Sequence, residues 1–309
     1  MASQHNLATF YQANTKVLKG WYSNYAKKVE ADYPEIFNVF ENDARLPYMT
    51  LLPIIEFGLM KVKPEGQAPA IDQMTEGNAT TFNFVTFSLG YTITDEGREE
   101  GPADILQTLP MRLVDAERVT KEYLFSNIFN LAATIGVNGA DGVPLLSTAH
   151  PLPGLPGQTY SNYAGNTALT PESLQNALVS MRLTPSDRGN PSTRTAETLL
   201  VHPYLEKIAY EVTGSDYYPY SQENKINVVK NKVQVKPYRY LTNQLAWFTL
   251  AKKGSLQSGD GHSLGISFKY QNRNREKVDE WTGQISQRAS FRVTFGFVNW
   301  RGVYGSSGA

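Results

Sequence analysis

The chain contains 309 residues with 29 basic and 29 acidic side chains, so its formal net charge at pH 7 is zero. A neutral chain has no global field that attracts nucleic acid or anionic membranes, which argues against avid non-specific DNA binding. The absence of cysteine excludes disulfides, thiolate chemistry and cysteine-based zinc sites. No run approaches the roughly 18 apolar residues of a membrane span, and the start lacks the pattern of a secretion signal. We expect a soluble, unexported chain with one large domain or two intimate subdomains.

The first 50 residues are rich in aromatic side chains, including Trp21, Tyr22 and Phe37. This segment has too much apolar area for a disordered tail, and its apolar period is too irregular for one long helix. We therefore expect an arm that lies against another surface, such as that of a neighbouring subunit. Short amphipathic helices packed on their own domain remain the alternative.

Two segments that follow the arm alternate apolar and polar residues with the period of a β-strand: "IEFGLMKVK" at 55–63 and "VTFSLGYTI" at 85–93. The residues between them begin with proline and glycine and lack a sustained apolar repeat. The pattern predicts a long hairpin with a wide polar tip of about a dozen residues, a loop size that is usually functional or disordered. Because Phe82 and Phe84 have the opposite parity to Val85, the second strand should bend or bulge at that point.

A long helix is predicted at about 102–135. Pro102 suits its first turn and Gly136 its stop. Apolar residues recur at helical spacing from Leu113 to Leu131, including Tyr123, and we expect them on one buried face. Pro110 should kink or divide this helix.

The rest of the chain mixes helices and strands without a regular strand-helix-strand repeat. Thr170 is a predicted N-cap for a helix over "PESLQNALVSMRL", and "PYLEKIAYEV" predicts a second helix. The segments "TLLVH", "LAWFTLA" and "ASFRVTFGFVNW" read as strands. This order favours an α+β fold over a doubly wound α/β fold.

Ser147 and His150 are close in sequence and raise the possibility of a serine hydrolase. A catalytic pair also needs an orienting acid, an oxyanion hole and a pocket, and the Gly-x-Ser-x-Gly turn is absent. The four histidines are far apart, and no pair has metal-ligand spacing. The glycine-rich "GDGHSLG" at 259–265 lacks the lysine of a phosphate loop. We predict no catalytic site, no cofactor and no metal, and expect Ser147 and His150 to pin a turn.

Several motifs in one order resemble those of a known family. "LLSTAHPLPG" at 145–154 and "YSN" at 160–162 resemble the signature of the Mu-like major head subunits of tailed phages. "LLVHPYLEKIAYEV" at 199–212 is similar to a downstream strand and helix of those proteins. "NQLAWFTLA" at 243–251 is similar to their tryptophan-bearing strand, and "FGFVNWRGVYGSSGA" at 295–309 to their closing strand. Together these motifs resemble major capsid proteins of the Hong Kong 97 fold.

The resemblance implies an assignment of parts. Residues 1–50 would form the N-terminal arm and 51–95 the extended hairpin loop. Residues 96–165 and 256–309 would form the peripheral domain with its spine helix, and 166–255 the axial domain. Family members build icosahedral heads around DNA from pentamers and hexamers. A homo-oligomer is therefore expected, located in the virion and assembled in the host cytoplasm, with only non-specific DNA contacts and no membrane.

The resemblance also implies contacts and partners. The candidate intersubunit residues are Trp21, Tyr22 and Phe37 in the arm and Lys61, Lys63, Glu65, Asp72 and Glu76 in the hairpin. No long scaffolding segment precedes the arm, so a separate scaffold protein is expected, together with a portal and a possible cement protein. A lysine-to-asparagine crosslink occurs in one branch of the family but maps to no particular residue here.

Two other readings on related architecture stay open at the level of sequence. One is a compartment shell of the encapsulin type, and the other is a tail or baseplate component of a phage. The hydrolase that would use Ser147 and His150 is the third alternative.

Overall fold

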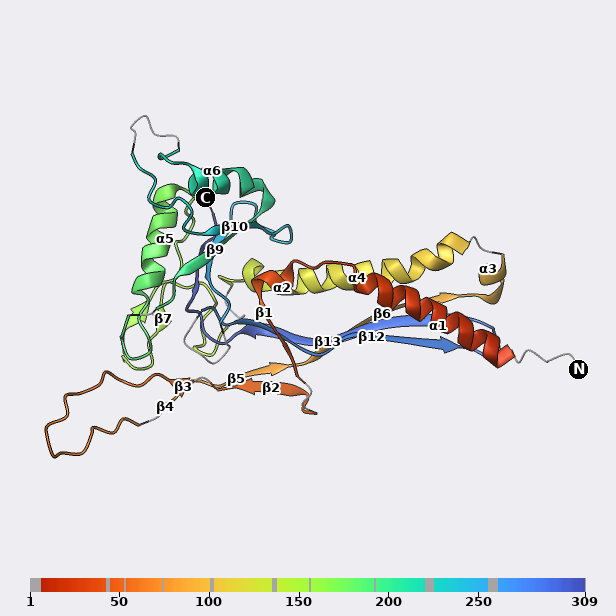
Figure 1. Ribbon diagram of the computed structural model, residues 1–309, viewed down its shortest axis with the longest axis horizontal. Helices are drawn as coiled ribbons and strands as arrows, with labels where there is room; N and C mark the ends of the chain where they lie inside the picture. The colour runs from red at the N-terminus through yellow and green to blue at the C-terminus, as the bar shows by residue number, and fades with distance from the viewer. Residues whose placement is uncertain are drawn as a thin grey trace, which may run out of the picture.

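A computed structural model of the chain describes residues 7–42, 45–52, 54–73, 75–100, 103–134, 138–155, 157–191, 193–219, 225–254 and 261–308. These residues form an elongated body with two four-stranded sheets, and a hairpin projects from the body (Figure 1). The mixture of helices and strands agrees with the predicted α+β class.

One sheet, the long sheet, has the strand order β1-β12-β13-β6. Its strands are β1 (Asn38–Glu41), β12 (Leu264–Val278), β13 (Ile285–Phe297) and β6 (Val85–Ile93). β13 pairs antiparallel with both β12 and β6, and β1 pairs parallel with the first residues of β12. The alternating patterns at 85–93 and near the C-terminus therefore both correspond to strands, as predicted.

Helix α4 (Ala103–Asn130) runs along the long sheet (Figure 1). Its 28 residues span about 42 Å at 1.5 Å per residue. Pro110 lies inside the helix and does not divide it. The predicted start Pro102 and stop Gly136 lie outside the described residues.

The buried face of α4 agrees with the predicted one only in part. Leu113 and Ile128 are buried as predicted, whereas Tyr123 and Leu131 are exposed. Phe125 and Phe129 are buried in addition. The buried face also contains Glu117 and Lys121, and these charges hid it from a search for apolar periodicity.

The arm contains a 20-residue helix, α1 (Leu7–Ala26), which the sequence reasoning had excluded. It lies beside α4 (Figure 1), and Leu18 and Tyr22 are buried. The signal was present in the sequence, because Leu18, Tyr22 and Ala26 follow one another at four-residue intervals along one helical face. Counting all aromatics together, on every side of the helix, obscured this spacing.

The second sheet, the short sheet, has the order β10-β9-β11-β14. Its strands are β10 (Gln234–Pro237), β9 (Ala196–Val201), β11 (Trp247–Ala251) and β14 (Val303–Ser306). Helices α5 (Pro171–Leu183) and α6 (Glu206–Gly214) lie against it, with the short helix η1 (Pro203–Leu205) before α6. Thr170 caps α5 as predicted.

The last strand does not follow the expected division of the chain. The resemblance grouped all of 256–309 with the spine helix, but β14 pairs with β11 in the short sheet, with Val303 opposite Leu250. The chain therefore crosses between the two sheets before its end. One continuous core joins them, since Phe125 and Phe268 of the long-sheet side share a cluster with Leu200 and Phe248 of the short sheet.

The projecting hairpin is built differently from the prediction. Its paired base consists of β2 (Tyr48–Leu51) with β5 (Thr80–Asn83), followed by β3 (Ile54–Ile55) with β4 (Thr75–Glu76). The predicted strand over 55–63 is not a paired strand, and β6 belongs to the long sheet. The predicted break near Val85 is confirmed, because Phe84 separates β5 from β6 and the two strands have different partners.

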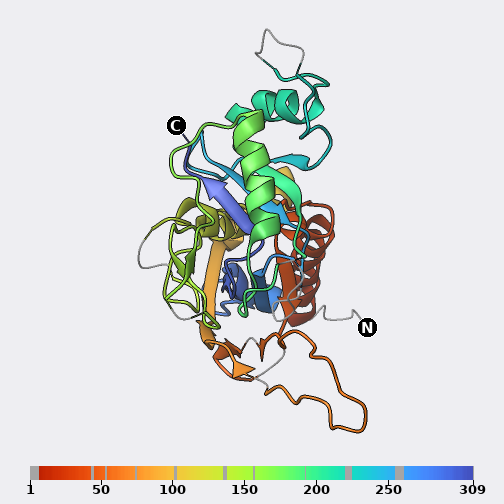
Figure 2. The same cartoon turned by 90° about the vertical axis from the view of Figure 1, so that its left-hand side faces the viewer.

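The remaining elements are short: α2 (Tyr33–Ile36), α3 (Asp95–Glu99), β7 (His150–Pro151) and β8 (Thr159–Tyr160). In both views the hairpin leaves the body on the side away from α6 (Figure 1 and Figure 2).

Candidate assembly surfaces

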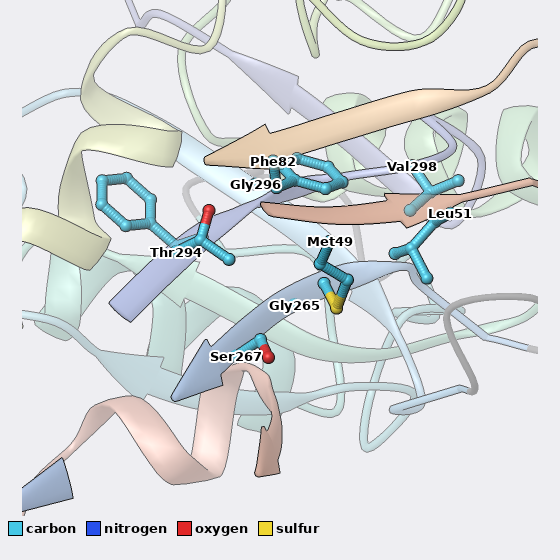
Figure 3. A pocket seen from close by; sticks show the side chains of 9 residues that line it. Met49, Leu51, Phe82, Gly265, Ser267, Thr294, Gly296 and Val298 are labelled. Carbon is cyan, nitrogen blue, oxygen red and sulfur yellow. The ribbon is translucent and has the colours of Figure 1, made fainter. Parts of the chain in front are cut away.

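The base of the hairpin is seated on the long sheet by a close contact. A Cβ atom added to Gly296 of β13 would lie 2.4 Å from Cε1 of Phe82 in β5, so only glycine fits beneath this ring in its present position. Figure 3 shows Phe82 at Gly296, with Met49 and Leu51 of β2 nearby. The seat fixes where the hairpin leaves the body.

A second contact holds the hairpin further out. The Asp72 carboxylate accepts a hydrogen bond from the Gly58 N–H at 2.8 Å and forms an ion pair with Arg188 at 3.0 Å. The Gly58 N–H and the Arg188 guanidinium together lower the pKa of Asp72. The loop that carries Arg188 is itself held, because Arg301 forms an ion pair with Asp187 at 2.9 Å. Asp72, predicted to meet a neighbour, is therefore engaged within its own chain.

We call the Asp72–Arg188 ion pair the latch. Beyond it, the hairpin consists of two segments, which have no strand pairing among the described residues and are joined by a β-turn. The turn closes with a hydrogen bond from the Gln67 N–H to the Pro64 carbonyl at 3.2 Å, and Gly66 has φ +74°, as a type II turn requires. The backbone from 56 to 64 has no turn or bend and no strand partner among the described residues.

The hairpin tip, residues 56–73, exposes apolar side chains. Phe57 is 63% exposed, Leu59 79%, and Met60 and Val62 almost completely. Ile71 on the returning arm is also exposed. Lys61, Lys63 and Glu65 are exposed beside them, as is Glu76 at the base. Contiguous exposed apolar groups mark an interaction site more often than isolated ones do.

The arm residues behave in the opposite way. Tyr22 is 2% exposed and Phe37 1%, so both belong to the core of their own subunit and are corrected from the predicted contact set. Trp21 is partly exposed. The arm therefore docks in cis, as the alternative reading had allowed.

A buried polar cluster fastens α1 and α4 to the long sheet. The Tyr22 hydroxyl donates to Glu117, which pairs with Lys121 at 2.7 Å. Lys121 also donates to the Gln271 carbonyl and the Asn272 Oδ1, both at 3.0 Å, where β12 departs from regular pairing with β13. Burial lowers the pKa of Lys121 and raises the pKa of Tyr22, and the hydrogen bond to Glu117 raises it further.

Glu122 fixes the path from α1 to β1. Its carboxylate accepts hydrogen bonds from the N–H groups of Asp32 at 2.6 Å and Tyr33 at 3.1 Å, and from the Tyr238 hydroxyl at 2.8 Å. Burial raises the pKa of Glu122, and these hydrogen bonds partly oppose that shift. Sequence reasoning missed this residue because a glutamate within a helix pattern is usually solvated.

Ser147 and His150 are not arranged as a nucleophile and base. The Ser147 Oγ accepts a hydrogen bond from the Ala149 N–H at 3.1 Å, which closes a local turn. The His150 Nδ1 lies 2.7 Å from Asp141 Oδ2, and its Nε2 lies 3.0 Å from Asn162 Oδ1. The ring is fully buried and stacks on Trp300 with centroids 4.3 Å apart. Both ring nitrogens are thus engaged by residues other than Ser147, and the pair pins a turn.

Across the described ranges, no group of three or more histidine, aspartate or glutamate side chains could hold a metal ion. No helix in this part of the chain has both the length and the apolar character needed to cross a bilayer.

Comparison with known proteins gives a consistent picture. The family described as "Phage capsid protein" matches residues 77–306, and the chain belongs to this family. A search of the curated proteins finds no match. The match spans the long sheet from β6 onward, α4 and the short sheet.

Solved structures with a similar fold come from phage particles. The capsid structure of cyanophage P-SCSP1u matches with a TM-score of 0.57 at 10% identity, covering 91% of this chain and 88% of that chain. The mature capsid of bacteriophage PhiM1 matches at 0.56 and 9%, covering 90% and 87%. A structure of Mycobacterium phage Adephagia matches at 0.55 and 9%, covering 91% of each chain. The fold is that of tailed-phage capsid proteins, and the chain is a structural subunit of a phage capsid.

Proposed function

We propose that copies of this chain tile an icosahedral head as pentamers and hexamers around double-stranded DNA, without catalysing a reaction. The observation that carries the proposal is the hairpin tip, whose side chains Phe57, Leu59, Met60 and Val62 are exposed and uncovered by the described residues of their own subunit. A shell supplies that cover through many copies of one contact, and such interfaces usually bury more than about 2,000 Å² per pair.

The parts of the molecule suit named roles in this proposal. The long sheet with α4 would be the peripheral domain, with α4 as its spine, and the short sheet with α5 and α6 the axial domain. The motifs "LLSTAHPLPG" and "FGFVNWRGVYGSSGA" support a Mu-like subtype. The proposed contact residues are Trp21, Lys61, Lys63, Glu65 and Glu76. Tyr22, Phe37 and Asp72 leave this set because they contact their own chain.

The proposal includes partners and a place of assembly. A separate scaffold protein, a portal and a cement protein would join the shell, which would form in the host cytoplasm and end as part of the virion. Contacts with packaged DNA would be non-specific, since the chain carries no net charge that would hold DNA tightly.

Electron microscopy of the expressed protein, alone and with the products of neighbouring genes, tests the proposal. Closed round particles of one size that package DNA are expected. Round shells that enclose protein cargo and no DNA would indicate a compartment, and tubes or discs would indicate a tail component. A Ser147→Ala variant should assemble unchanged, whereas loss of a hydrolytic activity in that variant would favour the hydrolase.

A further inference from the structure

The free edge of the long sheet lacks the features that normally protect an edge strand. β6 is nine residues long, and in the described part of the chain its one partner strand is β13. Its sequence, Val-Thr-Phe-Ser-Leu-Gly-Tyr-Thr-Ile, contains no charge and no proline. Val85 and Leu89 are 53% and 58% exposed. Natural proteins cover or charge such an edge, because its unpaired N–H and C=O groups template pairing with another strand.

The opposite side of the same sheet provides a contrast. β1 covers β12 only from Gly265 to Phe268. Beyond Phe268 no described strand pairs with this edge of β12, and this part of the strand carries Arg273, Arg275, Glu276 and Lys277. Charged side chains of this kind discourage strand addition. The lack of protection at β6 is therefore a local property and not a feature of the whole sheet.

The hairpin tip contains an extended segment, residues 56–63, that has no strand partner among the described residues. Residues 56–63 have strand periodicity in the sequence and a backbone without turns or bends. At about 3.3 Å per residue these eight residues span about 26 Å, close to the roughly 30 Å of β6. The second segment of the hairpin tip, residues 67–73, is less suited to strand pairing, because Pro69 lacks an N–H and Asp72 is held by Arg188.

The backbone of residues 56–63 has one edge available for pairing with another strand. Successive residues of an extended chain point their N–H and C=O groups to opposite edges. The Gly58 N–H points to Asp72 across the hairpin. The backbone groups of the flanking residues Phe57 and Leu59 therefore point outward, away from the returning arm, where another strand can pair with them.

Residues 56–63 cannot reach β6 of their own subunit. β6 and the hairpin tip extend in opposite directions from the hairpin base near Phe84 (Figure 1). A contact between residues 56–63 and β6 must therefore join two copies. The contact is heterologous, because each copy donates its hairpin segment to one neighbour and receives the segment of another. Contacts of this kind close into rings when the rotation between copies allows it.

We infer that residues 56–63 of one copy add to β6 of a neighbouring copy as a fifth strand of the long sheet. The inference rests on the proposed shell function and names the surface that receives the hairpin. The added strand covers Val85 and Leu89 of the neighbour and buries Phe57 or Met60 according to the face presented.

The absence of cysteine makes the test direct. Leu89→Cys is combined, one at a time, with a cysteine at each position from Phe57 to Val62, and assembled particles are oxidised and run on a non-reducing gel. Disulfides need Cβ atoms about 3.5–4.5 Å apart, which neighbouring strands provide only for side chains on the same face. Covalent dimers and larger rings are expected for every second cysteine position between Phe57 and Val62. Single-cysteine chains serve as controls. Particles with no bond to residue 89 at any arm position, or with equal bonding at consecutive positions, would overturn the inference.

A second pair of variants checks the edge without cysteine. Leu89→Lys places a charge on the exposed edge and should lower particle yield at least tenfold while the subunit keeps its melting temperature within a few degrees. Val179→Lys, an apolar-to-lysine change on α5 at a side chain that is 47% exposed, is the matched control and should assemble normally. Equal yields for the two variants would contradict strand addition at β6.

The two experiments separate this inference from the function on which it rests. If the unchanged protein forms shells but shows neither the alternating bonds nor the effect at Leu89, strand addition fails and the capsid role stands. If the unchanged protein with its scaffold forms no shells, the proposed function fails and the inference fails with it.

Discussion

The N-terminal arm and the hairpin both carry aromatic side chains, but Tyr22 of the arm is buried and Phe57 of the hairpin is exposed. Tyr22 of the arm is 2% exposed, while Phe57 of the hairpin is 63% exposed. The arm matches its apolar residues to a helical face and docks on α4 of its own subunit. The hairpin tip has no such face, and residues 56–64 have no strand partner among the described residues. The arm therefore stabilises the subunit, whereas assembly is the role that we propose for the hairpin.

Replacing one aromatic residue in each region should give the largest contrast. Tyr22→Ala removes a buried ring and the hydroxyl that donates to Glu117, so we expect a loss of about 3–5 kcal/mol in unfolding free energy. Phe57→Ala should change that free energy by less than about 0.5 kcal/mol but reduce shell yield. Chemical denaturation and particle counting measure the two effects. Tyr22→Phe, which keeps the ring, should fall between them, and an equal stability loss in both alanine variants would contradict the comparison.

Acid sensitivity should also come from the body and not from the tip. His262 is buried, its Nδ1 has no partner among the described residues, and burial together with Lys253 lowers its pKa from 6.5 to about 4. Since the unfolded state then binds the proton first, the contribution of His262 to stability is present above about pH 6.5 and is lost as the pH falls through 4. The loss is up to about 3 kcal/mol. Denaturation from pH 7 to 4 should show a shallower decline for His262→Gln than for the unchanged chain, and identical slopes would refute this.

A smaller effect is expected at the seat of the hairpin. Gly296→Ala forces Phe82 to move and should cost about 1–3 kcal/mol, because the added Cβ meets the ring at 2.4 Å. The smaller side chain of Phe82→Leu in the same molecule should recover part of that loss. Denaturation of both single variants and the double variant measures the coupling. Additive effects would show that the two residues do not meet.

The smallest effect on stability is expected at the latch. Asp72 and Arg188 are partly exposed, with 40% and 27% of their side chains accessible, so Arg188→Ala should cost less than about 1 kcal/mol. Its effect should fall on assembly, because the hairpin then loses the contact that directs it. Arg182→Ala, in the last turn of α5, provides a control in a nearby exposed arginine. Equal shell yields for the two variants would show that the Asp72–Arg188 ion pair does not direct the hairpin in assembly.

Much of the fold was predictable because it depends on local pattern. The strand at 85–93, the break before it, the long helix and the Thr170 cap each follow from residues close in sequence. The partners of strands were not predictable, since β6 pairs with β13 about 200 residues later and the last strand crosses to the short sheet. The buried network of Glu117, Lys121 and Glu122 was also missed. Glu117 and Lys121 pair within one helix, but their further partners and those of Glu122 come from distant parts of the chain.

Amide hydrogen exchange over residues 56–73, measured in dissociated subunits and again in assembled particles, tests the central claim most directly. In free subunits we expect nearly unprotected exchange at most of these residues, because residues 56–64 have no strand partner among the described residues. The exceptions are the N–H groups of Gly58, Gln67 and Gln73, which donate hydrogen bonds within the hairpin. In particles, protection should appear in residues 56–63 and along β6, while α1 should be protected in both states. A hairpin tip already protected in the free subunit, or unprotected in the particle, would contradict the claim.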